Sequence, residues 1–381
     1  MRCFKIFSII VGIGLVAVML WSFRLSPGPS YNGHTLSEWV EACGEYPYTP
    51  KHWASMPEIE EAIRHSGRRS VPFLLRWIRD KPRSSSGDDR QAAFRAVGAV
   101  SAFGILGTNA NFAIPDLMRI AQRPDDYDWP NPDPAWGVEP QQFCNEYAVF
   151  ALANIGPNTV PSLLSLATNS SVNVQRNDVY LLSTMGTNAL PAIPLLLHYL
   201  QEPTNRVAVI AARSLGTLKL EPSIVVSALA DALADKKYLL DYGTNGPYDQ
   251  RMLFLDKVFD SLGAYGPKAD SALPAIIGWL KVDDWFAPQM AADTLGNFTS
   301  EPDLVVPALT ACLENRNPYL VMSAAESLGK FGSSATSAVP ALIKVSDSTN
   351  SMRNARIAAA DKALEQITNL VPTALSAPVV R

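Results

Sequence analysis

A proline that begins an apolar helix recurs along most of this chain at a nearly fixed step. It occurs seven times, and a serine takes its place once, at Pro72, Pro115, Pro161, Pro194, Ser227, Pro274, Pro307 and Pro340. The successive steps are 43, 46, 33, 33, 47, 33 and 33 residues. A period of 33 residues that is broken by three insertions is typical of a solenoid of stacked repeats, and not of a single compact core.

Each period predicts two helices joined by a short turn. One helix ends in small residues followed by leucine and glycine, as in AARSLG (211–216), AADTLG (291–296) and AAESLG (324–329). The alanines allow a neighbouring helix to approach closely, and we expect the glycine to provide a left-handed cap that ends the helix. The proline then begins the second helix, where a missing N–H costs nothing. No segment shows the alternation of a strand, so the sequence predicts an all-α chain.

These motifs resemble the HEAT-like repeats of the bilin-lyase type, in which Ala-Ala-x-x-Leu-Gly is followed by Pro-x-Leu. The resemblance covers residues 57–345 and implies a right-handed α-solenoid of about eight helical hairpins. The family often carries an arginine three residues before the alanine pair, but here these positions hold Ala208, Pro288 and Val321. We therefore expect apolar stacking, without a polar ladder between repeats, to hold the array together.

The segments on both sides of the repeats suggest how the array begins and ends. Thr35 and Glu38 have the spacing of a capping box, so we expect a helix near residues 36–43 that seals the first repeat. The predicted organisation is an anchor (1–24), a stalk and N-terminal capping helix (25–56), the repeats (57–345), a C-terminal capping helix (346–369) and a loose tail (370–381).

The first 24 residues predict a membrane anchor. Ile6 to Phe23 is an uncharged stretch of 18 residues, which as a helix would span about 27 Å of hydrocarbon. Arg2 and Lys5 precede it, which favours a cytoplasmic N-terminus and extracytoplasmic repeats. A cleaved signal peptide is the alternative, and it would make the protein periplasmic or secreted.

The three insertions suggest a binding edge. They fall near residues 81–90, 124–140 and 236–250, which we place between the second helix of one repeat and the first helix of the next. Loops of this kind emerge on one edge of a solenoid. With the connection at 281–288, this edge would present Tyr127, Trp129, Trp136, Tyr238, Tyr242, Tyr248, Trp285 and Phe286 among several aspartates. Aromatic rings beside acceptors suit an extended peptide, a basic partner segment or a sugar chain. The alternative is that these rings only cover helix ends.

Charge is unevenly distributed although the net charge is only −4. From Arg64 to Arg95 there are nine Arg or Lys residues and three Asp, whereas residues 124–175 hold six acids and no Lys or Arg. The net charge gives no reason to expect nucleic acid as the partner. The basic stretch is either a solvated surface or a surface that lies against anionic lipid headgroups.

No catalytic, metal-binding or cofactor-binding residues can be assigned. The four histidines form no HExxH motif and no His-Glu pair, which the HEAT-like deoxyhypusine hydroxylases use to hold two irons. Asp126, Asp128 and Asp133 lack the glycine and the final glutamate of a known calcium loop. The four cysteines are too scattered for a disulfide scaffold, so we expect buried free thiols.

The sequence therefore predicts a non-enzymatic scaffold or adaptor that binds another protein or an extended peptide on the outer side of the cytoplasmic membrane. One alternative is an exported repeat protein with lyase-like or hydrolytic activity, which a loss of activity on changing Asp126, Asp128 or His198 would indicate. A third possibility is a basic-groove nucleic-acid binder similar to the alkylpurine DNA glycosylases, for which steep salt dependence would be the mark.

Overall fold

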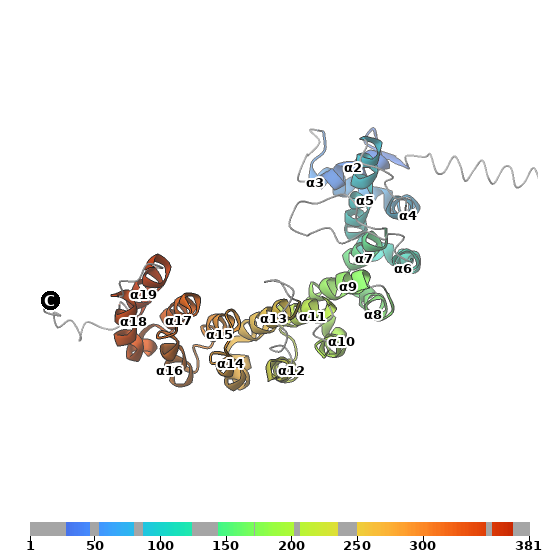
Figure 1. Cartoon of the computed structure of the whole chain (residues 1–381). Coiled ribbons are helices and arrows are strands. Elements are labelled where there is room, and N and C mark those ends of the chain that lie inside the picture. Colours follow the sequence, from blue (N-terminus) through green and yellow to red (C-terminus); the bar gives the residue numbers. More distant parts are fainter. Residues whose placement is uncertain are drawn as a thin grey trace, which may run out of the picture. The chain divides into compact units, whose positions relative to one another are not determined.

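The computed structural model describes residues 28–45, 53–79, 87–123, 144–170, 172–201, 206–234, 250–347 and 353–368. These residues are almost entirely helical, which confirms the predicted all-α class. The chain forms two compact units, Met1–Asp178 and Val179–Arg381, which are described one at a time (Figure 1). Residues 1–24 and 370–381, predicted as anchor and tail, lie outside the described residues.

Unit 1 consists of helices that pack on one another. Its helices are α2 (Leu36–Glu45), α3 (Met56–Ser66), α4 (Val71–Arg79), α5 (Gly87–Leu106), α6 (Ile114–Ala121), α7 (Cys144–Ile155), α8 (Val160–Asn169) and α9 (Val172–Ser183), which ends in unit 2. Short 3₁₀ helices join some of them: η1 (Gly67–Arg69), η2 (Gly107–Ala113) and η3 (Pro157–Thr159). Where α2 crosses α5, a methyl group on Gly44 would meet the Phe94 carbonyl, so glycine is required for this contact.

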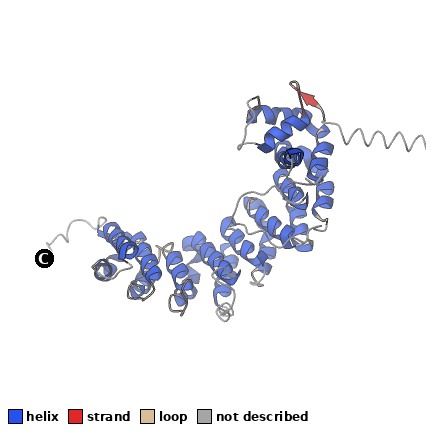
Figure 2. Ribbon diagram, turned by 45° about the horizontal axis from the view of Figure 1, so that its top comes forward, coloured by secondary structure: helices blue, strands red, loops and turns tan. Residues whose placement is uncertain are grey.

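The predicted stalk contains a small β-hairpin (Figure 2). Strand β1 (Ser30–Tyr31) pairs antiparallel with β2 (His34–Thr35), and Asn32 and Gly33 form the turn with φ of 47° and 82°. The Tyr31 ring lies 4.7 Å from the His65 ring of α3, between ring centroids, so this segment packs on the unit. A two-residue strand is too short to show the alternation on which a sequence prediction depends.

The capping box predicted at the start of the next helix is present. The Thr35 N–H donates to the Glu38 carboxylate at 2.7 Å, and the Glu38 N–H donates to the Thr35 hydroxyl oxygen at 3.3 Å. These bonds satisfy backbone donors that the first turn of α2 would otherwise leave free. The His34 ring stacks on Trp53 at 3.9 Å beside this turn.

Unit 2 contains two rows of helices (Figure 1). One row holds α11 (Arg206–Leu218), α13 (Gln250–Tyr265), α15 (Ala287–Leu295), α17 (Pro318–Lys330) and α19 (Arg353–Thr368). The other row holds α10 (Ile193–Tyr199), α12 (Pro222–Ala234), α14 (Leu273–Trp279), α16 (Pro302–Cys312) and α18 (Val339–Ser346). The 3₁₀ helices are η4 (Gly186–Ala192), η6 (Gly266–Ala272) and η7 (Gly332–Ala338). We call the first row the glycine helices and the second row the proline helices.

The helical hairpin has a different register from the one that the sequence suggested. Each proline helix packs on the glycine helix that follows it, as in α12 with α13, α14 with α15 and α16 with α17. The 3₁₀ helices η6 and η7, and the shorter turns in their place, then carry the chain to the next proline helix. The insertions near 81–90, 124–140 and 236–250 therefore join the two helices of one hairpin (α4 and α5, α6 and α7, α12 and α13), and not two neighbouring hairpins as predicted.

The glycine of the AAxxLG motif is not the left-handed cap that we expected. Gly296 has a φ of −62°, and Gly329 lies inside α17. The left-handed glycines begin the 3₁₀ helices, with φ of 57° at Gly186, 54° at Gly266 and 52° at Gly332. The left-handed turn is thus formed by a second glycine, and the motif alone does not show which of the two glycines forms it.

Instead, the motif glycine allows neighbouring glycine helices to approach each other. A Cβ atom on Gly216 would lie 2.7 Å from the Ser261 Cβ, and a Cβ atom on Gly296 would lie 2.9 Å from the Ser327 Cβ. Both distances are shorter than real Cβ contacts. The paired alanines beside these glycines are fully buried, which confirms their predicted role in close packing.

A polar ladder of buried serines joins three pairs of neighbouring helices, α9 with α11, α11 with α13 and α15 with α17, contrary to our expectation. Its three members are Ser214, whose hydroxyl donates to the Val179 carbonyl at 3.2 Å, Ser261, which donates to Ala212 at 2.7 Å, and Ser327, which donates to Ala292 at 2.8 Å. Each serine directly precedes the leucine of its motif and is almost completely buried.

One helical stretch in the described part of the chain is long and apolar enough to cross a membrane by length and composition alone. It runs from Gln91 to Ala121 through α5, η2 and α6, and 44% of its most apolar window is buried inside the protein. These helices pack on α2, α4 and α7, as core helices of a soluble domain also do.

Candidate functional site on the glycine helices of unit 2

Three acidic side chains occupy the same repeat position on successive glycine helices. Asp260 on α13, Asp293 on α15 and Glu326 on α17 are separated by 33 residues and are all exposed. Each directly precedes the buried serine or threonine of its motif, so the register that buries the hydroxyl exposes the acid. We call these three residues the acidic face.

The exposed side of each helix continues beyond its acid. On α15, Met290 lies three residues before Asp293, and such spacing places the two on the same face of the helix. Asn297 lies two residues beyond the end of α15 and lines the same cleft. On α17, Met322 and Lys330 flank Glu326 at spacings of four residues. The acidic face is therefore a mixed surface, in which thioethers lie beside carboxylates.

A small cleft separates α13 from α15 at this face. Its volume is about 160 Å³, and its lining is Asp256, Phe259, Asp260, Met290, Asp293, Thr294 and Asn297. The Lys257 ammonium donates to Asp256 at 2.7 Å and to Asp260 at 2.8 Å, so part of the negative charge is already balanced. Asp293 and Glu326 form no ion pair of this kind among the described residues.

The electrostatics of the cleft centre on Asp293. Partial desolvation of its carboxyl raises its pKa, although the residue as a whole is exposed, and the charges of Glu326 and Asp260 raise the pKa further. Ser323 and Lys330 act in the opposite direction. A carboxylate whose pKa is raised by neighbouring negative charges marks a position where a cation is bound favourably.

Three aromatic side chains lie at the N-terminal ends of the same helices. Trp285 and Tyr319 are each 50% exposed and Phe286 is 41% exposed. The Trp285 and Tyr319 rings meet edge to face, with centroids 6.3 Å apart and an interplanar angle of 72°. The Asn317 side-chain amide donates to the Trp285 carbonyl at 2.7 Å, and this bond fixes one helix start against the next. We call Trp285, Phe286 and Tyr319 the aromatic rim.

The predicted binding edge is described only in part. Tyr127, Trp129, Trp136, Tyr238, Tyr242 and Tyr248 lie outside the described residues. Trp285 and Phe286 are exposed as the prediction requires, and the Asp284 carboxylate accepts the Phe286 N–H at 2.8 Å. Tyr319 and the acidic face were missed, although Tyr319 follows Phe286 by 33 residues and the repeat alone could have identified it.

The other candidate residues considered from sequence are either exposed singly or outside the described residues. The leucines around His198 in LLLHYL predict a partly buried position, but His198 is exposed on α10. Asp126, Asp128 and Asp133 lie outside the described residues. No group of three or more His, Cys, Asp or Glu residues that could hold a metal occurs in the part of the chain that is described. Cys43 and Cys312 are buried free thiols as predicted, and burial raises the pKa of each to about 11.

The repeat pattern of α15 to α19 agrees with a known family. The sequence model of HEAT repeats matches this part of the chain. The match covers residues 289–362. The resemblance inferred from AAxxLG and Pro-x-Leu is thereby confirmed, while the repeat number and the handedness stay predictions. No curated protein sequence matches the chain.

Several solved structures resemble this fold at low sequence identity. The CpcE–CpcF phycocyanin lyase of Nostoc sp. PCC7120 is 20% identical with a TM-score of 0.36, over 64% of this chain and all of that one. The karyopherin Kap121p bound to the extreme C-terminus of the phosphatase Cdc14p is 14% identical with a TM-score of 0.48, over 82% of this chain and 42% of that one. Human deoxyhypusine hydroxylase is 15% identical with a TM-score of 0.29, over 80% of this chain and 98% of that one.

These likenesses concern the fold alone. The chain spans less than half the length of the karyopherin, and two of the three structures are enzymes. HEAT solenoids are typical of protein-binding scaffolds and are usually non-catalytic, but enzymatic activity stays open at this level of similarity.

Proposed function

We propose that this protein is a binding scaffold, and that the acidic face with its aromatic rim binds an extended, basic segment of a partner protein. The observation that carries this proposal is the recurrence of an exposed acid at Asp260, Asp293 and Glu326. Helix packing does not require an acid at an exposed position, whereas it does require the glycine and serine beside it.

The spacing of the face suits an extended ligand. Neighbouring glycine helices pack against each other directly, so their axes lie about 8–10 Å apart. An extended peptide advances about 6.6 Å every two residues, so basic side chains two or three residues apart could each meet one acid. Aromatic and thioether groups beside the acids would contact the alkyl stems of lysine or arginine.

A fluorescence anisotropy titration tests this proposal. The full chain in non-ionic detergent is titrated into a labelled peptide of alternating lysine and leucine, and into the same peptide with glutamate in place of lysine. We expect saturable binding of the lysine peptide alone. Replacement of the face by Asp260→Asn, Asp293→Asn and Glu326→Gln should weaken binding by about tenfold or more.

A matched variant controls for net charge. Three exposed acids in the row of proline helices are removed. Asp231→Asn lies on α12, Glu301→Gln lies directly before α16, and Asp303→Asn lies in the first turn of α16. This control should change the affinity less than about threefold, because surface charges that do not contact the ligand act mainly through screened long-range attraction. Equal weakening by the two triple variants, or no binding of the lysine peptide, would contradict the proposal.

The aromatic rim is tested separately. Trp285→Ala together with Tyr319→Ala should weaken binding of the lysine–leucine peptide, because rigid rings contribute most of the contact energy in peptide interfaces. Leu304→Ala is the control, since Leu304 is similarly exposed but belongs to α16 in the other row. An unchanged affinity in the double variant would limit the site to the acids.

The proposal also places the scaffold on the outer side of the cytoplasmic membrane. The support for this location is the uncharged stretch from Ile6 to Phe23 after two basic residues. In alkaline carbonate extraction the full chain should stay in the membrane pellet, and a chain without residues 1–24 should not. Release of the full chain into the supernatant would contradict a retained anchor.

A further inference from the structure

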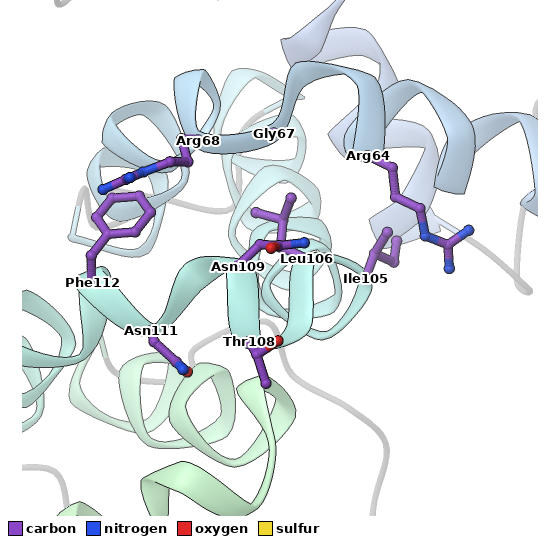
Figure 3. A pocket seen from close by; sticks show the side chains of 9 residues that line it. All are labelled: Arg64, Gly67, Arg68, Ile105, Leu106, Thr108, Asn109, Asn111 and Phe112. Carbon is purple, nitrogen blue, oxygen red and sulfur yellow. The ribbon is translucent and has the colours of Figure 1, made fainter.

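A cavity in unit 1 is distinct from the acidic face. Its volume is about 580 Å³, and it lies where the end of α3 and η1 meets the end of α5 and η2. Figure 3 shows its lining: Arg64, Gly67, Arg68, Ile105, Leu106, Thr108, Asn109, Asn111 and Phe112. This volume falls within the range of pockets that hold small molecules, and it is much larger than a single ion requires.

The lining contains hydrogen-bond donors and no carboxylate. Arg64 is already paired, since its guanidinium donates to Glu60 at 2.9 Å. Arg68 forms no ion pair with any acid among the described residues, and Thr108 and Asn109 add a hydroxyl and an amide. A cavity with an unpaired guanidinium and no acid attracts an oxyanion, to which arginine can donate two parallel bonds.

Arg68 is held in position by an aromatic ring. Its guanidinium carbon lies 4.2 Å from the centroid of the Phe112 ring, and Figure 3 shows the guanidinium lying over that ring. Arg64 lies at the other end of the cavity in the same view. Stacking restricts the guanidinium to one plane and leaves its N–H edge free for a ligand. Phe112 is 43% exposed, so a ligand could also contact it.

A second polar group in the wall lacks a partner. The side-chain oxygen of Asn111 is buried and accepts no hydrogen bond. A buried acceptor without a donor costs free energy, and rotation of the Asn111 side chain toward the cavity would let a ligand hydroxyl remove this cost. An oxyanion group of the ligand would accept hydrogen bonds from Arg68, and a ligand hydroxyl would donate one to the side-chain oxygen of Asn111.

From these observations we propose that the Arg68–Phe112 cavity binds a phosphate group esterified to a polyol, as in glycerol 1-phosphate or in the glycerol phosphate headgroup of a lipid. The two sources share one chemistry: an anionic phosphate with a hydroxyl nearby. This inference is independent of the peptide-binding proposal, because it concerns other helices and the opposite charge.

Calorimetric titration of the full chain in non-ionic detergent tests the soluble source. Glycerol 1-phosphate should bind saturably, whereas glycerol, which lacks the charge, should not. Arg68→Ala should weaken this binding by about tenfold or more, and Arg68→Lys should weaken it less, because lysine keeps the charge but loses the fork. Arg69→Ala is the matched control, since Arg69 is exposed on the same 3₁₀ turn but does not line the cavity.

A second variant separates recognition from a purely structural effect. Asn111→Ala should reduce the preference for glycerol 1-phosphate over inorganic phosphate, because it removes the acceptor that the hydroxyl would satisfy. A variant that only destabilised unit 1 would weaken the binding of glycerol 1-phosphate and of inorganic phosphate by the same factor. Thermal unfolding of each variant without ligand shows whether the unit is intact.

The lipid source is tested in detergent micelles that contain phosphatidylglycerol or phosphatidylcholine. A rise in the melting temperature with phosphatidylglycerol that Arg68→Ala abolishes and Arg69→Ala retains would support the lipid headgroup as the source. If neither the soluble phosphate nor the lipid binds in an Arg68-dependent manner, or if Arg68→Ala and Arg69→Ala weaken binding equally, the proposal is wrong.

Discussion

The buried and the exposed sides of the glycine helices in unit 2 are built from adjacent residues, but different physical requirements select them. On the buried side, Gly296 and Ser327 are in contact, and any larger residue would separate the helices. On the exposed side, Asp293 and Glu326 recur with the same period although no packing contact requires them. A repeated residue on the buried side thus reports the fold, and a repeated residue on the exposed side points to a ligand.

The strongest test of this distinction is a natural exception on the buried side. Asp178 on α9 lies 33 residues before Ala211, in the register where α15 and α17 also have a buried alanine. Its side chain is fully buried, neither carboxyl oxygen has a hydrogen-bond partner, and desolvation raises its pKa to about 9. The folded chain therefore carries a proton on Asp178 at neutral pH.

Asp178→Ala should stabilise the protein in a pH-dependent manner. The folded pKa is about 9, and the usual value is 3.8, so the folded state binds more protons and wild-type stability falls as the pH rises from 4 to 9. The variant lacks this loss. The difference in the free energy of unfolding between the variant and wild type should therefore be roughly 3 kcal/mol larger, in favour of the variant, at pH 7 than at pH 4. Denaturant unfolding at the two pH values measures the difference.

An exposed aspartate provides the control for Asp178. Asp231→Ala on α12 removes an exposed side chain and should change the free energy of unfolding by less than about 0.5 kcal/mol. An Asp178→Ala variant that is equally destabilised at pH 4 and pH 7 would mean that the carboxyl has a partner in the folded protein.

The next largest effect is expected where a side chain is added to the buried side. Gly296→Val places a branched side chain against Ser327 and should lower the free energy of unfolding by about 2–3 kcal/mol. Gly278→Ala on α14 is the control, because its added Cβ meets no atom within 4 Å. That variant should be neutral or more stable by up to about 1 kcal/mol, since alanine favours the helix. Equal effects of the two substitutions would show that the helices are not in close contact.

Which of these features could be predicted from sequence depends on how each one is encoded. The 33-residue step and the AAxxLG motif predicted the helices and the buried alanines, because close packing restricts those positions to few residue types. The hairpin register was wrong because the same alternation of helices fits two pairings, and only spatial contacts such as α16 on α17 distinguish them. The serine ladder was missed because serine is also common at exposed helix positions.

The candidate sites were less predictable for a related reason. Trp285 was chosen as a candidate because aromatic residues in a loop are unusual, whereas an exposed acid such as Asp293 is common on any helix. The Arg68–Phe112 cavity combines residues 44 positions apart that are joined only by the packing of η1 on η2. Neither residue recurs in the other repeats, so the period could not reveal it.

The serine ladder provides a smaller test of the buried side. Ser327→Ala removes a hydrogen bond to the Ala292 carbonyl and should cost about 1 kcal/mol of stability. The exposed Ser333 is the control, and Ser333→Ala should change the free energy of unfolding by less than about 0.5 kcal/mol. A loss at Ser327 no greater than at Ser333 would mean that the ladder only accompanies close packing and adds nothing to it.

The smallest effect on stability is expected on the acidic face. Partial desolvation and the nearby carboxylates raise the pKa of Asp293, so its ionised form becomes less favourable in the folded state as the pH rises above the usual value. Asp293→Asn should therefore be neutral near pH 4 and slightly more stable than wild type at pH 8, by no more than about 0.5 kcal/mol. The same substitution should weaken binding of the lysine–leucine peptide. A residue that lowers stability and yet supports binding is retained for its ligand, whereas a clear loss of stability at pH 8 would assign Asp293 to the packing of α15 on α17.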